Sequence, residues 1–87
     1  MNGFFSNGDG FAIALSGDQV RFVRTVLRDK QPEFAKRIAI SHSSIKRIER
    51  RGAEKIVGPE IVLVAMLADA FGIDIPDKVV VDPSNPE

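Results

Sequence analysis

The sequence predicts an all-α fold, a compact bundle of four to five helices, from its apolar spacing, its helix caps and its helix-breaking residues. Apolar residues recur three and four positions apart through most of residues 16–75, which is the period of a helix with one buried face. Serine, glycine and proline divide this stretch at the places where helices begin and end. With 87 residues, the chain has room for one hydrophobic core. Short strand-like segments at the N- and C-terminal ends are a further option.

The first fifteen residues are an N-terminal arm with little helix-forming sequence. Residues 11–15 alternate large and small apolar side chains, as a strand does. Disorder before residue 11 is the alternative interpretation. Ser16 and Gln19 have the spacing of a capping box, so we expect the first helix to begin at Ser16 and to end near Arg28.

Two short helices follow. Pro32 is tolerated only in a first helical turn, so the second helix is expected to start around Gln31. Ser41 is a good N-cap for a third helix, and Gly52 is expected to end it. The second and third helices are therefore separated by only a few residues.

The fourth helix is the most apolar of the chain. After a loop over residues 53–58, Pro59 occupies a favourable first helical position, and Gly72 ends the helix. Residues 73–75 are expected to fold back onto the core. Seven apolar side chains are expected in that core: Ala35, Ile40, Ile45, Ile48, Leu63, Leu67 and Phe71.

The composition excludes several classes of function. The chain has no cysteine, which excludes disulfides, thiolate metal sites and cysteine nucleophiles, and its single histidine argues against a zinc site. Its longest apolar stretch, residues 61–68, is far shorter than a membrane span, and no basic-then-apolar leader is seen. We expect no enzyme activity, metal, cofactor or membrane partner, and a cytoplasmic location.

The charges are unevenly distributed, although 12 Lys+Arg balance 12 Asp+Glu. Between Arg28 and Lys55 there are nine basic residues and four acidic ones, a local excess of five positive charges. Clustered cations set the local potential even when the total charge cancels, so this excess favours a polyanionic partner. A solvated helical face is the alternative interpretation.

Residues 31–49 carry the most specific pattern. Two short helices separated by Ala39-Ile40-Ser41 must cross steeply, which exposes the N-terminal end of the later helix. The pattern is Gln31-x-Glu33-Phe34-Ala35-x-x-Ile38-Ala39-Ile40-Ser41-x-Ser43-x-Ile45-x-x-Ile48-Glu49. It resembles the helix-turn-helix of phage repressors and Cro proteins, the broad Cro/repressor-type (XRE) family of bacterial regulators. The resemblance covers roughly residues 16–75.

The sequence departs from the family pattern at three places. The usual serine or threonine cap before the second helix is Lys30 here, with Asp29 as a candidate substitute cap. The family's glycine in the turn is Ala39, and the glycine after the third helix comes one residue late, at Gly52.

The resemblance implies that the third helix, starting near His42, enters the major groove of double-stranded DNA. It assigns base contacts to four residues: His42, Ser43, Lys46 and Arg47. Arg47 is the most informative, because a guanidinium can donate two hydrogen bonds to guanine. Phosphate contacts are expected from four residues: Gln31, Arg50, Arg51 and Lys55. An exposed helix surface without DNA contact stays open for His42, Ser43 and Lys46.

The resemblance also implies an ion pair between Arg24 and Glu49, which would tie the first helix to the end of the third. It divides the chain into an N-terminal arm (1–15), a helix-turn-helix DNA-binding domain (16–75) and a C-terminal tail (76–87). Within the tail, residues 79–81 could form a short strand before a disordered end.

The expected function is a sequence-specific DNA-binding transcriptional regulator, a repressor, that acts as a homodimer on a palindromic operator. The protein would be bacterial or phage-encoded and associated with the nucleoid when it is bound to DNA. Residues 11–15 and 79–81 are apolar strand material that could make the dimer contact. The alternatives are an antitoxin-like autoregulator, with a toxin or an antirepressor as partner, and a protein-interaction module on the same fold.

Overall fold

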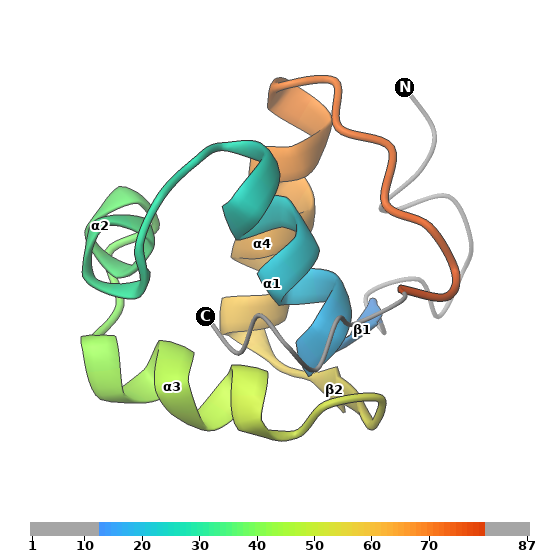
Figure 1. Ribbon diagram of the computed structural model, residues 1–87, viewed down its shortest axis with the longest axis horizontal. Helices are drawn as coiled ribbons and strands as arrows, with labels where there is room; N and C mark the ends of the chain where they lie inside the picture. Colours follow the sequence, from blue (N-terminus) through green and yellow to red (C-terminus); the bar gives the residue numbers. More distant parts are fainter. Residues whose placement is uncertain (1–12, 80–87) are drawn as a thin grey trace.

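A computed structural model describes residues 13–79, which form four helices and a two-stranded antiparallel sheet (Figure 1). The elements follow the order β1 (Ala14–Ser16), α1 (Gly17–Val26), α2 (Gln31–Arg37), α3 (His42–Arg50), β2 (Lys55–Val57) and α4 (Pro59–Ala70). The mainly helical fold agrees with the prediction. The first strand of the small sheet falls where a short N-terminal strand was an option, whereas its second strand was not expected.

The sheet joins two segments that lie about forty residues apart. Leu15 of β1 stands opposite Ile56 of β2, and Leu15 is buried. The predicted N-terminal strand is therefore present in its last residues, whereas its earlier part lies outside the described residues. β2 was predicted as a loop, and that prediction was wrong. Val79 lies in no strand, and the remainder of the predicted C-terminal strand, residues 80–81, also lies outside the described residues.

The helices begin where their capping residues predict. Ser16 Oγ accepts a hydrogen bond from Gln19 N at 3.1 Å, and Gln19 Oε1 accepts one from Ser16 N at 2.9 Å, so the predicted capping box is present. Ser41 Oγ accepts from Ser44 N at 3.1 Å and caps α3. After α3, Gly52 has a left-handed backbone (φ +61°), which ends the helix as predicted.

The connection from α1 to α2 uses Asp29 differently from the prediction. Asp29 does not cap α2; its carboxylate accepts two hydrogen bonds from Arg37, at 2.6 and 2.9 Å. These hydrogen bonds lower the pKa of Asp29 below its ordinary value. At the start of α2, Glu33 Oε1 instead accepts a hydrogen bond from Lys30 N at 2.8 Å. The connection therefore contacts both ends of α2, through the Lys30 backbone at its start and the Asp29 side chain at its end.

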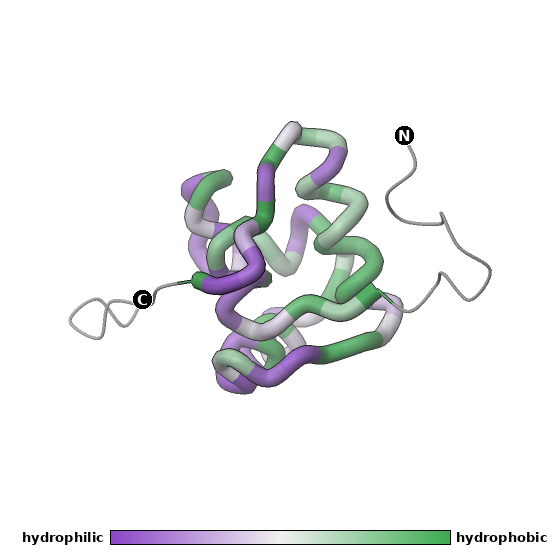
Figure 2. Tube along the Cα trace, turned by 90° about the vertical axis from the view of Figure 1, so that its right-hand side faces the viewer, coloured by the Kyte–Doolittle hydropathy of each residue, from purple (hydrophilic) through white to green (hydrophobic). Residues whose placement is uncertain are grey.

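The core lies where the four helices meet. Its most completely buried side chains come from every helix: Phe34, Ile45, Ile61, Val20, Val23 and Val64. Figure 2 shows apolar and polar residues alternating along the chain, as expected for helices with one buried side. Among the predicted core residues, Ala35, Ile45 and Ile48 are buried, and Ile40 and Leu67 are half-buried against the core.

Two core predictions were wrong, and both concern α4 and its end. Leu63 is 41% exposed and Phe71 is 55% exposed. α4 is apolar on nearly every side, so its sequence has no helical period from which the buried face could be chosen. The fold buries the side that carries Ile61, Val64 and Ala68. Within residues 13–79, no helix is long and apolar enough to cross a membrane.

The start of α1 packs directly on the end of α3 through the main chain. Asp18 N donates a hydrogen bond to Gly52 O at 2.8 Å. A Cβ atom added at Gly17 would lie 2.3 Å from Ile48 O and 2.9 Å from Gly52 N. Only a glycine permits this approach, so the backbone itself fixes where the C-terminal end of α3 lies against α1.

Candidate functional site

A tight turn sets α3 against α2. Ala39 has a left-handed backbone (φ +61°), and Ile40 N donates to Ala35 O at 2.9 Å. Ser41 then starts α3, so four residues separate the two helices. Figure 1 shows α3 along the lower edge of the molecule, where one of its sides faces away from the other helices.

The outer side of α3 carries cations and neutral polar groups. Its exposed side chains are His42, Ser43, Lys46, Arg47 and Arg50. The one acid of α3, Glu49, is turned inward and is only 8% exposed. The exposed side therefore presents three full positive charges and no negative charge of its own, which suits it to contact a polyanion.

Glu49 forms the ion pair that was expected with Arg24. Arg24 Nε donates to Glu49 Oε2 at 2.6 Å, and Arg24 Nη2 donates to Glu49 Oε1 at 3.0 Å. Arg24 is 3% exposed, and its Nη1 also donates to Asp29 O at 3.0 Å. The pair thus joins α1, the α1–α2 connection and the end of α3 through two parallel charge-assisted hydrogen bonds.

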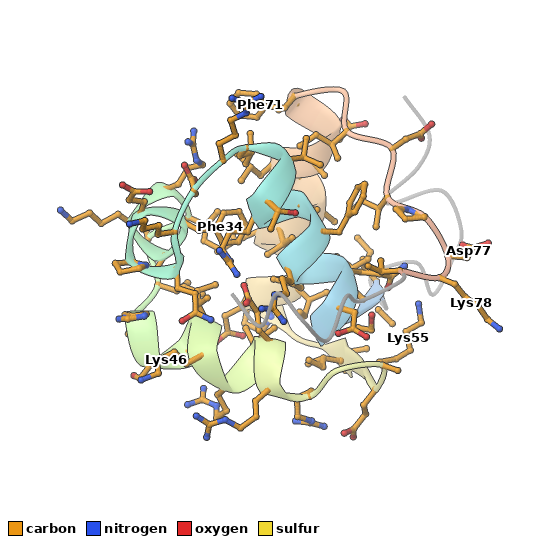
Figure 3. All side chains as sticks on the ribbon, in the orientation of Figure 1. Phe34, Lys46, Lys55, Phe71, Asp77 and Lys78 are labelled. Atoms are coloured by element: carbon orange, nitrogen blue, oxygen red, sulfur yellow. The ribbon has the colours of Figure 1, made fainter. Side chains whose placement is uncertain are left out.

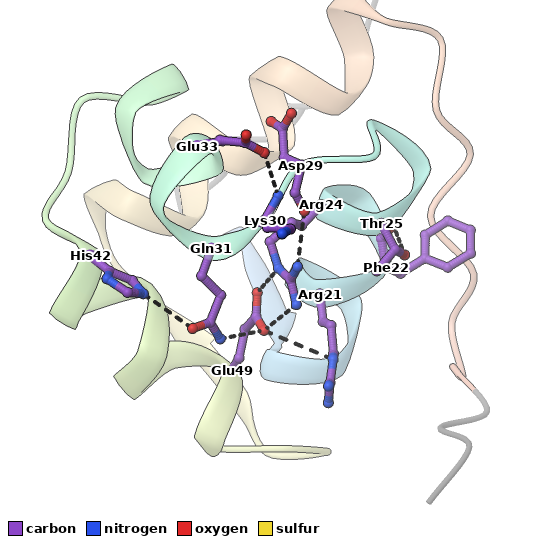
Figure 4. A network of polar contacts seen from close by, with 10 residues as sticks. All are labelled: Arg21, Phe22, Arg24, Thr25, Asp29, Lys30, Gln31, Glu33, His42 and Glu49. Carbon is purple, nitrogen blue, oxygen red and sulfur yellow. Dashed lines mark hydrogen bonds and ion pairs between the residues drawn. The ribbon is translucent and has the colours of Figure 1, made fainter. Parts of the chain in front are cut away.

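A chain of polar contacts leads from this buried pair to the start of α3 (Figure 4). Gln31 Nε2 donates to Glu49 Oε1 at 3.1 Å. On its other side, Gln31 Oε1 lies 3.3 Å from His42 Nε2. Gln31 and His42, which were predicted to contact phosphate and base respectively, are therefore brought into contact with each other.

An open hollow of about 210 Å³ lies between α1, α2 and α3. Five side chains line it: Arg21, Gln31, Lys46, Glu49 and Arg50. The Glu49 carboxylate in this lining is paired with Arg24, and three of the other lining side chains, Arg21, Lys46 and Arg50, are cationic. Cationic side chains grouped in this way suit an anion, with which they can form charge-assisted hydrogen bonds.

Arg21 was not among the predicted site residues. Its Nε lies 4.0 Å from Glu49 Oε1, and its side chain is partly exposed. Arg21 precedes Arg24 by three residues on the same helix face. That spacing is the signal by which the sequence could have assigned Arg21 to the site.

The structure does not bring every predicted residue to this place. Arg47 is exposed but lines a different hollow of about 100 Å³, together with Ile56 and Glu60. Arg51 donates to Glu54 at 2.6 and 2.9 Å, and these hydrogen bonds lower the pKa of Glu54.

Lys55 is also engaged within the chain, since its Nζ donates to Gln19 Oε1 at 2.8 Å. Figure 3 shows Lys46 and Lys55 at opposite sides of the lower part of the molecule. Lys55 therefore lies away from the hollow that Lys46 lines. Within residues 13–79, no three His, Asp or Glu side chains are grouped so that they could hold a metal ion.

Comparison of the chain with protein-family models, curated proteins and solved structures gives no match. The function of the site therefore has to follow from its own residues: an exposed cationic helix side, a buried ion pair beneath it and a cation-lined hollow beside it.

Proposed function

We propose that this protein is a sequence-specific double-stranded DNA-binding regulator, a repressor, in which α2 and α3 form a helix-turn-helix. The observation that carries the proposal is the charge distribution of α3. Lys46, Arg47 and Arg50 are exposed, while Glu49 is buried against Arg24. A large share of the free energy of DNA binding comes from cations that neutralise phosphates, and an acid on the exposed side would oppose it.

In this proposal α3 lies in the major groove, which is wide enough for one α-helix. His42 and Ser43, in the first turn, and Arg47, one turn further on, contact base edges. Arg47 donates two hydrogen bonds to the O6 and N7 atoms of a guanine.

The backbone contacts come from the hollow beside α3. Arg21, Gln31 and Arg50 surround one phosphate there, and Lys46 lies between this phosphate and the bases. Arg51 and Lys55 add affinity only when they exchange their present partners, Glu54 and Gln19, for phosphate oxygens.

We also propose that two copies bind a palindromic operator as a homodimer, because one such domain contacts too few base pairs for useful specificity. The two α3 helices would lie about 34 Å apart, one turn of DNA. One edge of β1 is already occupied by β2 of the same chain. Leu63 and Met66, exposed one helical turn apart on α4, offer an apolar surface for the contact.

Light scattering at micromolar concentration measures the mass of the free protein and of its complex with a palindromic duplex. A monomer in both measurements would overturn the proposed homodimer.

The test of DNA binding is a selection of bound sequences from random duplexes by the purified protein, where an enriched palindrome is expected. Affinity for the selected duplex should fall as salt rises, with a log–log slope of about −0.9 per neutralised phosphate. No enrichment, together with binding that does not depend on salt, would contradict the proposal.

Three single variants then separate base contacts from phosphate contacts. Arg47→Ala should weaken specific binding by about 1–3 kcal/mol and leave non-specific binding nearly unchanged. Arg50→Ala should weaken both and reduce the salt slope by about one. Lys78→Ala removes an equal charge far from α3 and is the matched control, with little expected effect (Figure 3). Equal losses on selected and random DNA for the Arg47 variant would show that this residue contacts phosphate.

A further inference from the structure

In the series of polar contacts that ends at His42, the donor and the acceptor of each hydrogen bond are fixed. Glu49 is held by two hydrogen bonds from Arg24, so it is an ionised carboxylate that can only accept. Gln31 must therefore turn its NH₂ group toward Glu49, where Nε2 and Oε1 are 3.1 Å apart. The opposite amide orientation would set two oxygens against each other at this distance. The buried pair thus decides which way the Gln31 amide faces.

The direction of the Gln31 amide decides the state of the imidazole. Gln31 Oε1, which can only accept, faces His42 Nε2 at 3.3 Å. His42 Nε2 must therefore carry the proton. In a neutral imidazole the other nitrogen is then a bare acceptor, and Nδ1 of His42 points away from Gln31 (Figure 4).

We infer that His42 recognises a base that presents an amino group in the major groove, adenine or cytosine, through Nδ1 as the acceptor. Adenine offers N6–H₂ and cytosine offers N4–H₂, whereas guanine and thymine present only acceptors and a methyl group at that edge. Gln31 is the positioning residue, since it contacts His42 and not the base. The inference rests on the proposed function and names a base preference that histidine by itself does not have, because histidine can donate or accept.

The first test needs no DNA. Nitrogen-15 NMR of the free protein in mildly alkaline solution, where an imidazole is neutral, identifies the protonated nitrogen. A protonated Nε2 and a bare Nδ1 are expected in the wild type, with a measurable admixture of the other tautomer in Gln31→Ala. A wild-type ring protonated at Nδ1 overturns the inference.

The second test uses the duplex obtained by selection from random sequences. Each adenine is replaced in turn by purine, which lacks the amino group, and each cytosine by pyrimidin-2-one. At one position in each half-site this replacement should reduce wild-type affinity about fivefold, the effect of one lost neutral hydrogen bond. The loss should vanish in His42→Ala and shrink in Gln31→Ala, because a released ring no longer presents Nδ1. Lys78→Ala, the control, should keep the full loss.

The outcomes separate the inference from the function on which it rests. Failure to enrich any duplex overturns the proposed DNA binding, and the base preference with it. Suppose that a duplex is enriched, but that no replacement of an amino group causes an affinity loss that vanishes in His42→Ala. That result overturns the base preference alone. The base preference is also overturned if the base pair whose identity matters to wild type but not to His42→Ala requires guanine or thymine at the contacted position.

Discussion

Because the Arg24–Glu49 pair is buried, we expect the small change Glu49→Gln to reduce the stability of the folded protein strongly. The substitution keeps the size of the side chain but removes its charge and replaces one acceptor oxygen with an NH₂ group. Glu49 accepts hydrogen bonds from two nitrogens of Arg24 and one of Gln31, at 2.6, 3.0 and 3.1 Å. In the variant, a guanidinium that is 3% exposed would lose the charged carboxylate to which two of its nitrogens donate.

Breaking a buried pair by removing one partner costs about 3–5 kcal/mol, because the remaining charge stays out of water and loses the opposite charge of its partner. A domain of this size has only about 5–15 kcal/mol of total stability. Urea unfolding at neutral pH, followed by circular dichroism, should therefore show a much lower midpoint for Glu49→Gln. The matched control is Glu54→Gln, which removes an exposed partner of Arg51 and should shift the midpoint very little.

The double variant Arg24→Met/Glu49→Met extends the test. It leaves neither charge behind and should regain much of the stability lost in Glu49→Gln, since apolar residues of similar volume often replace buried ion pairs at little cost. A Glu49→Gln protein that unfolds at the wild-type midpoint would refute this reasoning, because it would mean that the Arg24 guanidinium reaches water without its partner.

Three further predictions concern the backbone and the pH dependence. Gly17→Ala should destabilise the protein by about 2–3 kcal/mol in the same urea assay, since its Cβ would overlap Ile48 O; an unchanged midpoint would show that α1 can shift on α3. Ala39→Gly should stabilise it by about 0.5 kcal/mol, because alanine is strained at φ +61°, and a loss of stability would mean that the methyl group has a packing role. The hydrogen bonds from Arg37 lower the pKa of Asp29, so the stability that they contribute is present above the ordinary pKa of about 3.9 and lost as the pH falls through the lower folded value. Unfolding midpoints measured from neutral to acidic pH should therefore fall less steeply for Asp29→Asn than for wild type, and parallel curves would contradict this assignment.

The parts of the fold that depend on local interactions could be predicted from the sequence. Ser16 and Ser41 cap their helices through atoms only three residues away, so residue type and spacing are enough to place those helix starts. β2 was missed because a three-residue strand has no identifying period and is defined by a partner far along the chain. The exposed side of α4 was missed because apolar residues on every side of a helix leave no pattern to interpret.

The candidate site divides in the same way. The exposed cations of α3 follow from helical spacing around its buried isoleucines. The contact between Gln31 and His42 does not, since it joins two helices whose relative orientation depends on the turn at Ala39. Arg51 and Lys55 were expected to be available for phosphate, but Glu54 and Gln19 hold them, which charge counting alone does not reveal.

The contact between the backbone of Gly17 and the last turn of α3 has a consequence for how such a protein could diverge. Because main-chain atoms and buried residues hold α3 in place, its outward side chains contribute little to its position. Exchanges at His42, Ser43 or Arg47 should therefore cost little stability, and under the proposed function each could change the preferred base at one position. Under the proposed function, a duplicated copy of this chain could thus acquire a new operator by single substitutions, with every intermediate still folded, while a change at Gly17 would be eliminated because it disrupts the fold itself.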